Sequence, residues 1–279
     1  MKKRLAFALA MLILCSCALC GCGKAAAPAA DSGVLRVAME CAYAPYNWTQ
    51  NDDSNGAVPI KDSNSYAYGY DVMMAKKIAE ALGKELVIYK QDWDSLVPAV
   101  VAGTVDCVIA GQSITSERME SVDFSVPYYY ASIVTLVRAD SEFANAQSVA
   151  DLSGVTCTSQ INTVWYDTCL PQIPDANILP AQETAGAAIV ALTAGKVDAM
   201  VTDEPTALAA CAANPDLKLL NFSGTDGDFE VSEEEINIGI SMQKGSELKN
   251  QIDQVLATMS EDDYTAMMQE AIKVQPLSE

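Results

Sequence analysis

The sequence predicts an α/β protein built from two similar lobes, and an internal repeat is the main observation behind this prediction. Residues 99–111 read AVVAGTVDCVIAG and residues 191–203 read ALTAGKVDAMVTD, and the two copies share Ala, Ala, Gly, Val and Asp without a gap. Each copy has the pattern of a helix end, a glycine that stops the helix, a short turn and a buried strand. Two copies of one helix–strand unit indicate two lobes of similar design.

The repeat also predicts where a ligand binds. It places Gly111 and Asp203 at equivalent points, each at the carboxyl end of a predicted strand, which is where ligands bind in open α/β sheets. Beyond Gly111, Thr115 can cap a helix whose first turn carries Arg118, and a guanidinium matches a carboxylate. An arginine on one lobe and an aspartate on the other suit the two charged ends of an α-amino acid. The alternatives are a surface salt bridge for Arg118 and a plain helix cap for Asp203.

Composition excludes several classes of function. The 279 residues suffice for two lobes, and a net charge of −20 argues against nucleic acid and anionic lipid headgroups as partners. The chain has no histidine, which removes histidine triads and imidazole metal ligands. No CxxC pair occurs among the five cysteines after residue 22, so we expect neither a metal nor another cofactor. Their odd number leaves at least one free thiol, although Cys157 and Cys169 could form a bridge.

The first 33 residues predict a lipoprotein signal peptide and a tether. Residues 1–22 have a positive start and an apolar run from Leu5 to Cys20 that is too short for a comfortable transmembrane helix. Residues 19–22, LCGC, resemble a bacterial lipobox, which predicts acylation of Cys22; Cys17 is the second candidate, and an uncut anchor helix is the alternative. Residues 23–33 are rich in small residues, as expected of a flexible tether.

Strands and helices alternate through the first predicted lobe. A strand at 34–39 leads to Glu40 and to an aromatic loop at 42–48, and the polar insert at 49–68 is expected to form a surface hairpin or a rim. The elements that follow are a helix capped by Asp71, a strand at 85–90, a helix that begins at Asp94 or Ser95 and ends at Ala102, and the repeat strand at 105–110.

The second predicted lobe follows a strand at 133–137, which we expect to leave the first lobe. Its predicted elements are a short helix at 148–154, a strand at 155–159, a loop at 160–163, a helix from about Val164, and the repeat helix at 183–194 with its strand. The chain then has a return strand at 236–242 and closing helices at 247–259 and 262–272. We therefore assign residues 34–137 and 238–279 to lobe 1 and residues 138–237 to lobe 2.

Seven stretches, taken together in their order and spacing, carry a family resemblance: LRVAMECAYAPYNW, GYDVMMAKKIAEALG, WDSLVPAVVAGTVDCVIAG, SITSER, VDFSVPYY, DLSG and VDAMVTDEP. Over about residues 34–275 the chain resembles the bacterial extracellular solute-binding proteins (family 3) of polar amino-acid ABC importers. The resemblance implies an α/β two-lobe periplasmic-binding-protein (Venus-flytrap) fold, whose lobes are joined by two hinge strands and close on the ligand. It also implies a monomer, held by its lipid at the outer face of the cytoplasmic membrane, that passes an amino acid to an ABC transporter permease.

The resemblance assigns roles to residues on both sides of the expected cleft. Arg118 matches the arginine that grips the α-carboxylate of the ligand, and Asp203 matches the carboxylate that receives the α-ammonium. Gly111 and Ser113 match positions that hydrogen-bond the ligand backbone, and we include the neighbouring Ala110 among the binding residues.

Two aromatic residues and one loop complete the predicted site. Tyr43 and Trp93 match aromatic wall positions, although Tyr43 could be a surface residue and Trp93 could belong to the core. Gln160 and Thr163 fall in the second-lobe loop that completes carboxylate binding through main-chain N–H groups. The family often has glycine where Asn162 stands, and asparagine tolerates a left-handed backbone better than most residues.

Glu40 matches an acidic position near the pocket mouth, where it would favour a basic or amide side chain over an acidic one. We predict a binding protein rather than an enzyme. One alternative is a dehydratase-type enzyme on the same fold, whose acid or base would have to be Glu40, Asp203 or a cysteine. The other is a ligand-sensing module that acts on a separate receptor.

Overall fold

The structure is a computed structural model that describes residues 33–232 and 236–276. The predicted leader, its candidate lipidation sites Cys22 and Cys17, and the tether up to residue 32 lie outside the described residues. Within the two described ranges, every helix is too short or too polar to cross a membrane.

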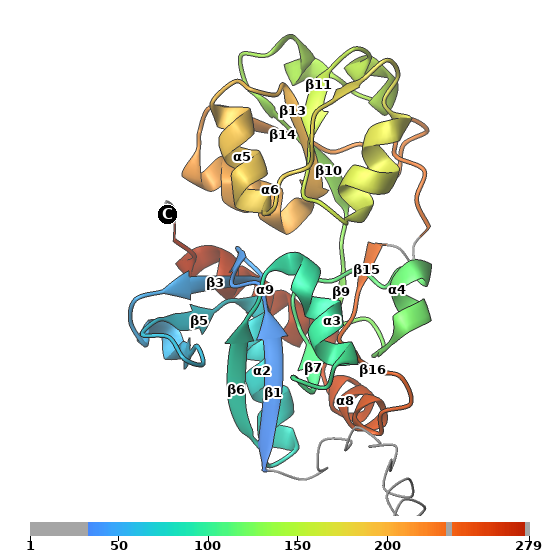
Figure 1. Cartoon of the computed structure of the whole chain (residues 1–279). Coiled ribbons are helices and arrows are strands. Elements are labelled where there is room, and N and C mark those ends of the chain that lie inside the picture. Colours follow the sequence, from blue (N-terminus) through green and yellow to red (C-terminus); the bar gives the residue numbers. More distant parts are fainter. Residues whose placement is uncertain (1–32, 233–235, 277–279) are drawn as a thin grey trace, which may run out of the picture. The chain divides into compact units, whose positions relative to one another are not determined.

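The first of two five-stranded sheets has the strand order β6-β1-β7-β16-β8 (Figure 1). Its strands are β1 (Val34–Met39), β6 (Glu85–Lys90), β7 (Cys107–Val108), β8 (Val122–Phe124) and β16 (Ser241–Gln243). β1 runs parallel to β6 and β7, whereas β16 is antiparallel to β7 and β8. The apolar residues at the end of β1 are fully buried because helices cover both faces of such a sheet.

The second sheet has the strand order β12-β11-β13-β10-β14. Its strands are β10 (Ile133–Arg138), β11 (Thr156–Thr158), β12 (Asn177–Ile178), β13 (Ala199–Asp203) and β14 (Leu217–Leu220). The sequence predicted that Ile133–Val137 leaves the first lobe, but β10 pairs along its length with β13 and β14. The first five residues of β10 are buried, so this apolar strand is a central strand of the second sheet rather than a connection.

Two chain segments connect the sheets. The chain passes from β8 through β9 (Tyr129–Tyr130) to β10, and it returns from β14 through β15 (Asn237–Ile238) to β16. β9 and β15 pair with each other as an antiparallel ribbon. This arrangement confirms the predicted two-lobe fold with two hinge strands. The exact lobe boundaries, 34–137 with 238–279 and 138–237, stay a prediction, and the pairing of β10 favours a crossing before residue 133.

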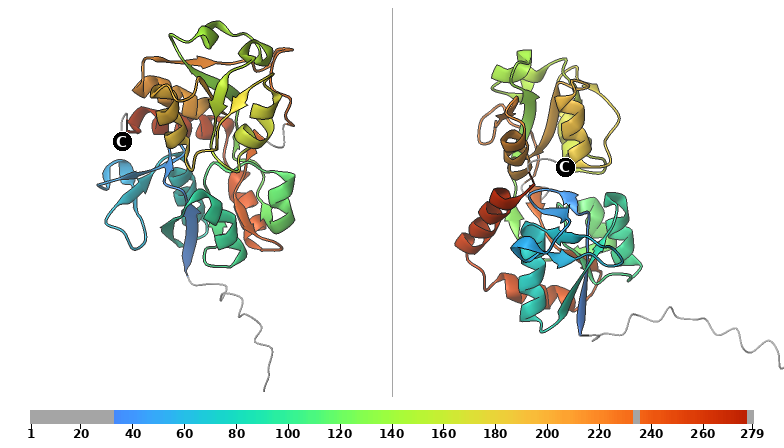
Figure 2. Two further views of the ribbon diagram at one scale, coloured as in Figure 1. Left: turned by 45° about the horizontal axis from the view of Figure 1, so that its top comes forward. Right: turned by 90° about the vertical axis from the view of Figure 1, so that its left-hand side faces the viewer.

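The helices divide between the two sheets, as Figures 1 and 2 show. Those of the first lobe are α2 (Tyr70–Ala81), α3 (Leu96–Val101), α4 (Ser116–Ser121), α8 (Leu248–Leu256) and α9 (Glu261–Val274). Those of the second lobe are α5 (Ala185–Thr193) and α6 (Glu204–Ala213). Short helical turns are η1 (Ser54–Gly56), η2 (Trp93–Ser95), η3 (Glu142–Asn145), η4 (Val149–Leu152), η5 (Trp165–Cys169) and η6 (Leu170–Gln172).

A small antiparallel sheet accounts for the aromatic loop and the polar insert. Its order is β2-β3-β5-β4, and its strands are β2 (Ala42–Tyr43), β3 (Asn47–Gln50), β4 (Val58–Pro59) and β5 (Tyr66–Tyr68). The turns at 51–56 and 61–64 are exposed, which confirms the expectation of a surface hairpin. Elsewhere in the chain, Cys157 is a buried free thiol and forms no bridge with Cys169.

Helix α2 begins differently from its prediction. The residue that precedes it is Gly69, and Asp71 does not cap the helix but lies buried in its first turn. Gly69 has a φ of 129°, and a Cβ there would lie 2.3 Å from the carbonyl oxygen of Tyr46. The close approach of α2 to the Tyr46 backbone therefore requires glycine at this position.

Each copy of the sequence repeat is anchored by an arginine from a central strand. Asp106 of the first copy binds Arg36 of β1, with Nη2 and Oδ1 2.7 Å apart. Asp198 of the second copy binds Arg138 of β10, with the corresponding atoms 3.1 Å apart. Both arginines also donate to carbonyl oxygens of the turn before the strand. The shared aspartate thus fixes the same helix–strand connection in both lobes.

Candidate functional site

Asp203 ends β13 and caps α6, and its carboxylate is fully buried. Oδ1 accepts a hydrogen bond from the Thr206 N–H at 2.9 Å, which is the helix cap. Oδ2 accepts from the hydroxyl of Tyr43 in the first lobe. Burial raises the pKa of Asp203 above its usual range. Among the described residues no Lys or Arg pairs with Asp203, so a buried carboxylate lacks a cation.

Tyr43 and Gly111 pack directly against each other. Gly111 has a φ of 62°, and a Cβ there would lie 2.9 Å from Cε1 of Tyr43. Only glycine fits both the left-handed backbone and this contact. The Gly111 N–H donates to the Tyr128 hydroxyl at 3.2 Å, so the main-chain group that Gly111 can offer a ligand is its carbonyl oxygen. The neighbouring Ala110 is buried in the first-lobe core, and its place among the binding residues stays a prediction.

Arg118 lies on α4, and the side chain of Thr115 caps this helix as predicted. The guanidinium donates through Nη1 to the Ser113 carbonyl oxygen at 2.9 Å and through Nη2 to the Asn162 carbonyl oxygen at 2.7 Å. Its centre lies 5.4 Å from the ring centroid of Trp93, a cation–π contact. Burial lowers the pKa of Arg118 to about 10, which leaves it charged at neutral pH. None of the described carboxylates forms an ion pair with it.

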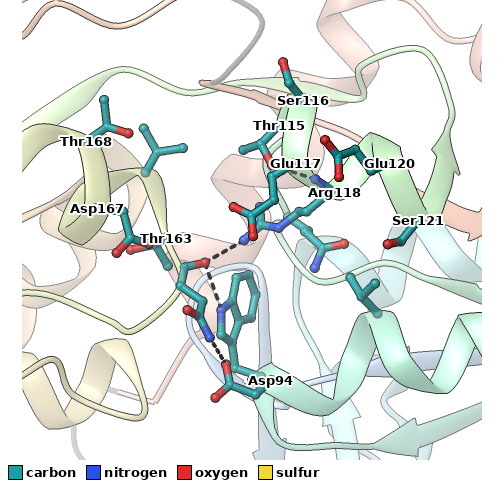
Figure 3. A pocket seen from close by; sticks show the side chains of 15 residues that line it. Asp94, Thr115, Ser116, Glu117, Arg118, Glu120, Ser121, Thr163, Asp167 and Thr168 are labelled. Atoms are coloured by element: carbon teal, nitrogen blue, oxygen red, sulfur yellow. Dashed lines mark hydrogen bonds between the residues drawn. The ribbon is translucent and has the colours of Figure 1, made fainter.

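The pocket beside Arg118 has a volume of about 610 Å³. Figure 3 shows the guanidinium of Arg118 pointing from α4 toward the second-lobe loop that carries Thr163. Three predicted site residues line this pocket: Arg118, Trp93 and Thr163. The other predicted residues do not line it and lie at more buried places: Glu40, Tyr43, Ala110, Gly111, Ser113, Gln160 and Asp203. Trp93 lines the pocket and also belongs to the first-lobe core, and its role as a wall of the ligand site stays a prediction.

Glu40 and Gln160 meet although they are 120 residues apart. Glu40 is 3% exposed, and its Oε1 accepts from Nε2 of Gln160 at 3.1 Å. Its other oxygen, Oε2, is buried without a hydrogen-bond partner. Burial raises the pKa of Glu40 to about 7, and the hydrogen bond from Gln160 opposes this shift. A buried acceptor without a donor is uncommon and indicates a place that a ligand donor could fill.

The second-lobe loop contacts the first lobe through Asn162. Asn162 has a φ of 54°, which confirms that asparagine adopts the left-handed conformation here. Its carbonyl oxygen accepts from Arg118 and, at 3.4 Å, from Nε1 of Trp93, and its amide donates to Asp94 at 2.7 Å. The Thr163 hydroxyl donates to the Gln160 carbonyl oxygen at 2.7 Å, so it closes its own loop.

Tyr46 is a residue of this region that sequence reasoning missed. Its ring stacks on Tyr43 with centroids 5.0 Å apart, and its buried hydroxyl has no hydrogen-bond partner. Burial raises the pKa of this hydroxyl, and the charge of Asp203 adds to the shift. The only signal for Tyr46 in the sequence is its place in the aromatic loop after Pro45.

Two α/β lobes joined by two strands, with an arginine on one lobe and a buried aspartate on the other, define a two-lobe solute-binding protein. Residues 35–273 match the sequence model of the bacterial extracellular solute-binding proteins, family 3. Since this match covers most of the chain, the protein belongs to that family.

Relatives include binding proteins and an enzyme. The chain is 30% identical over 193 residues to a probable histidine-binding protein of Campylobacter jejuni, covering 69% of this chain and 68% of the relative. It is 30% identical over 191 residues to the cyclohexadienyl dehydratase of Pseudomonas aeruginosa, covering 67% of this chain and 65% of the enzyme. A crystal structure of an amino acid ABC transporter substrate-binding protein from Streptococcus pneumoniae, bound to L-arginine, is similar with a TM-score of 0.75. That protein is 29% identical, and the similarity covers 87% of this chain and 95% of the other.

Proposed function

We propose that the protein captures an L-amino acid with a cationic side chain and delivers it to the permease of an ABC transporter. The observation that carries this proposal is that Arg118 on the first lobe and Asp203 on the second form no ion pair with any described residue. The α-carboxylate would take the place of the Asn162 carbonyl oxygen at Arg118. The α-ammonium would bind Asp203 beside Tyr43.

Glu40 supports the choice of a cationic side chain. Its Oε2 is buried without a donor, and a guanidinium, ammonium or imidazolium group supplies both the hydrogen bond and the opposite charge. The similarity to proteins named as histidine-binding and bound to L-arginine points in the same direction. An acidic ligand is disfavoured because its side chain would meet the Glu40 carboxylate.

Binding is coupled to closure of the two lobes. The carboxylate site and the ammonium site lie on different lobes, so one ligand satisfies both only when the lobes come together around it. The ligand therefore shifts the population toward the closed form, which the permease recognises. The protein acts as a monomer, anchored through a lipid on Cys22 at the outer face of the cytoplasmic membrane.

The test is a thermal-shift screen of residues 23–279 against the common L-amino acids, because a ligand of the folded state raises Tm by mass action. L-arginine and L-histidine are expected to raise Tm in the wild type but not in Asp203→Asn. This variant keeps an oxygen to accept from Thr206, and it loses the charge and the oxygen that accepts from the Tyr43 hydroxyl. Asp198→Asn is the matched control: it lies in the second copy of the repeat, pairs with Arg138 and should retain binding. If no L-amino acid shifts the wild type, the proposal fails.

A dehydratase activity is the second candidate, and the similarity to cyclohexadienyl dehydratase favours it. With its pKa raised to about 7, Glu40 could donate a proton to a leaving hydroxyl group, so that the C–O bond breaks and water departs while the ring carboxylate leaves as CO2 and the ring becomes aromatic. The protein would be incubated with an arogenate-like cyclohexadienyl compound, and aromatic product would be followed by its absorbance. Product that forms with the wild type and not with Glu40→Gln would establish the enzyme and displace the transport proposal.

A further inference from the structure

Asp71 is a second buried carboxylate of the first lobe that lacks a cation. Its side chain is fully buried in the first turn of α2, and no ion pair of the described residues includes it. Two side chains donate to it: the Tyr128 hydroxyl to Oδ1 at 2.6 Å and the Asn47 amide to Oδ2 at 2.7 Å. The positive end of the α2 dipole also stabilises a negative charge there.

The first of these bonds leads to the turn after β7. The Tyr128 oxygen that donates to Asp71 also accepts the Gly111 N–H at 3.2 Å. Gly111 stands in the left-handed conformation against Tyr43, and the segment that it begins carries Ser113 and Arg118. Asp71 orients the Tyr128 hydroxyl so that its lone pair faces Gly111, since the hydroxyl hydrogen is committed to the carboxylate.

The second bond leads to the turn between β1 and β2. The Asn47 amide donates to Asp71, and its oxygen accepts the Cys41 N–H at 2.6 Å. Cys41 has a φ of 54°, a conformation that a residue with a side chain keeps only when its surroundings hold it. Cys41 lies between Glu40 and Tyr43, so the place of both side chains depends on this turn.

We propose that Asp71 is a positioning residue of the binding site, because one buried carboxylate holds both turns that carry the ligand-binding groups of the first lobe. This inference rests on the proposed function. Asp71 itself touches no ligand: it acts on Gly111 through Tyr128 and through a backbone hydrogen bond from Gly111, and it acts on Cys41 through Asn47. Loss of one of its two acceptor oxygens weakens the hold on these turns and removes no atom from the binding surface.

The experiment measures the affinity of the whole chain after residue 22 for L-arginine by isothermal titration calorimetry, together with the free energy of unfolding in urea. The variants are Asp71→Asn, Tyr128→Phe and the double variant. Tyr70→Phe is the matched control: its hydroxyl is also buried and donates to the Tyr128 carbonyl oxygen at 2.7 Å, but it contacts neither turn. Asp71→Asn and Tyr70→Phe each lose one buried hydrogen bond, whereas Tyr128→Phe loses two, the bond to Asp71 and the bond from the Gly111 N–H.

Asp71→Asn is expected to weaken the affinity about tenfold or more, as for loss of a hydrogen bond to a charged group. Tyr128→Phe should have a similar effect. The double variant should lose much less affinity than the product of the two single losses, because both changes break the same connection. Tyr70→Phe should lose stability and keep its affinity within about twofold. NMR should show faster amide hydrogen exchange at Gly111 and Cys41 in Asp71→Asn, and at Gly111 in Tyr128→Phe.

The proposal is overturned if Asp71→Asn and Tyr128→Phe bind L-arginine as tightly as the wild type and lose only stability, as Tyr70→Phe does. Asp71 would then be a structural residue. Should Asp71→Asn not fold, Tyr128→Phe alone decides by the same comparison with Tyr70→Phe. If the wild type binds no amino acid, the proposed function fails, and the amide exchange of Gly111 and Cys41 still decides whether Asp71 holds the two turns.

Discussion

The affinity for a cationic amino acid should depend on pH through Glu40. Burial raises the pKa of this carboxyl to about 7 in the protein without ligand, so it takes up a proton at a pH where an exposed glutamate stays ionised. A cationic side chain binds the ionised form, because only that form offers an opposite charge at Oε2. Affinity should therefore rise as the pH rises through 7. The free energy of unfolding should show the opposite trend, because the native state holds a proton that the unfolded state has lost above about pH 4.3.

The magnitude follows from the ionised fraction of Glu40. With a pKa of about 7, this fraction is roughly one-tenth at pH 6 and nine-tenths at pH 8, so Glu40 alone weakens the affinity about tenfold at pH 6 relative to pH 8. Glu40→Gln keeps a hydrogen-bond acceptor for Gln160 and cannot ionise. Its affinity should be lower at pH 8, and its change between the two pH values should be smaller by this factor of about ten.

The assay is isothermal titration calorimetry of L-arginine at pH 6, 7 and 8 for the wild type and Glu40→Gln. Repeating the pH 6 titration in buffers of different ionisation enthalpy measures protons released on binding. The wild type should release more protons than Glu40→Gln. Identical pH profiles and identical proton release in the two proteins would refute the assignment of Glu40 to the side-chain site.

Two further substitutions test the geometry of the site. Gly111→Ala should lower the free energy of unfolding by about 1–2 kcal/mol for the left-handed backbone alone. It should also weaken L-arginine binding, because the new Cβ would lie 2.9 Å from the Tyr43 ring. Urea unfolding and calorimetry measure the two effects, and a variant with unchanged stability and affinity would contradict the contact. Asn162→Gly loses the bond from the Asn162 amide to Asp94, which joins the two lobes, so it should release ligand about two- to fivefold faster with little change in stability. Stopped-flow tryptophan fluorescence measures this rate, and Asp94→Ala should match it if the bond is the cause.

The repeat explains why the fold could be predicted from sequence. The shared aspartate marks the same connection in both lobes, and Asp106 and Asp198 both bind an arginine from a central strand. The course of β10 could not be predicted, because a buried apolar strand looks the same whether it lies inside a sheet or connects two lobes. The first turn of α2 was misjudged for a related reason: an aspartate before an apolar helix face is typical of a cap, and only the packing against Tyr46 shows that Gly69 precedes the helix.

Parts of the candidate site are visible in local sequence and parts are not. Asp203 and Thr115 were predictable because a cap and its helix are adjacent in the chain. Two hydrogen bonds of the site, from Gln160 to Glu40 and from the Tyr43 hydroxyl to Asp203, join residues that are more than a hundred positions apart. No local sequence pattern encodes such contacts. Tyr46 adds a buried hydroxyl that looks, in the sequence, like any aromatic core residue.

The central claim is that Arg118 binds the α-carboxylate of an amino acid, and a cycle of two proteins and two ligands tests it most directly. Calorimetry would compare L-arginine with agmatine, the same molecule without its carboxylate, on the wild type and on Arg118→Ala. The account predicts that Arg118→Ala weakens L-arginine binding at least 30-fold, about 2 kcal/mol, and changes agmatine binding by no more than about twofold. An equal loss for both ligands would show that Arg118 acts on the fold or the side-chain site, and would contradict the account.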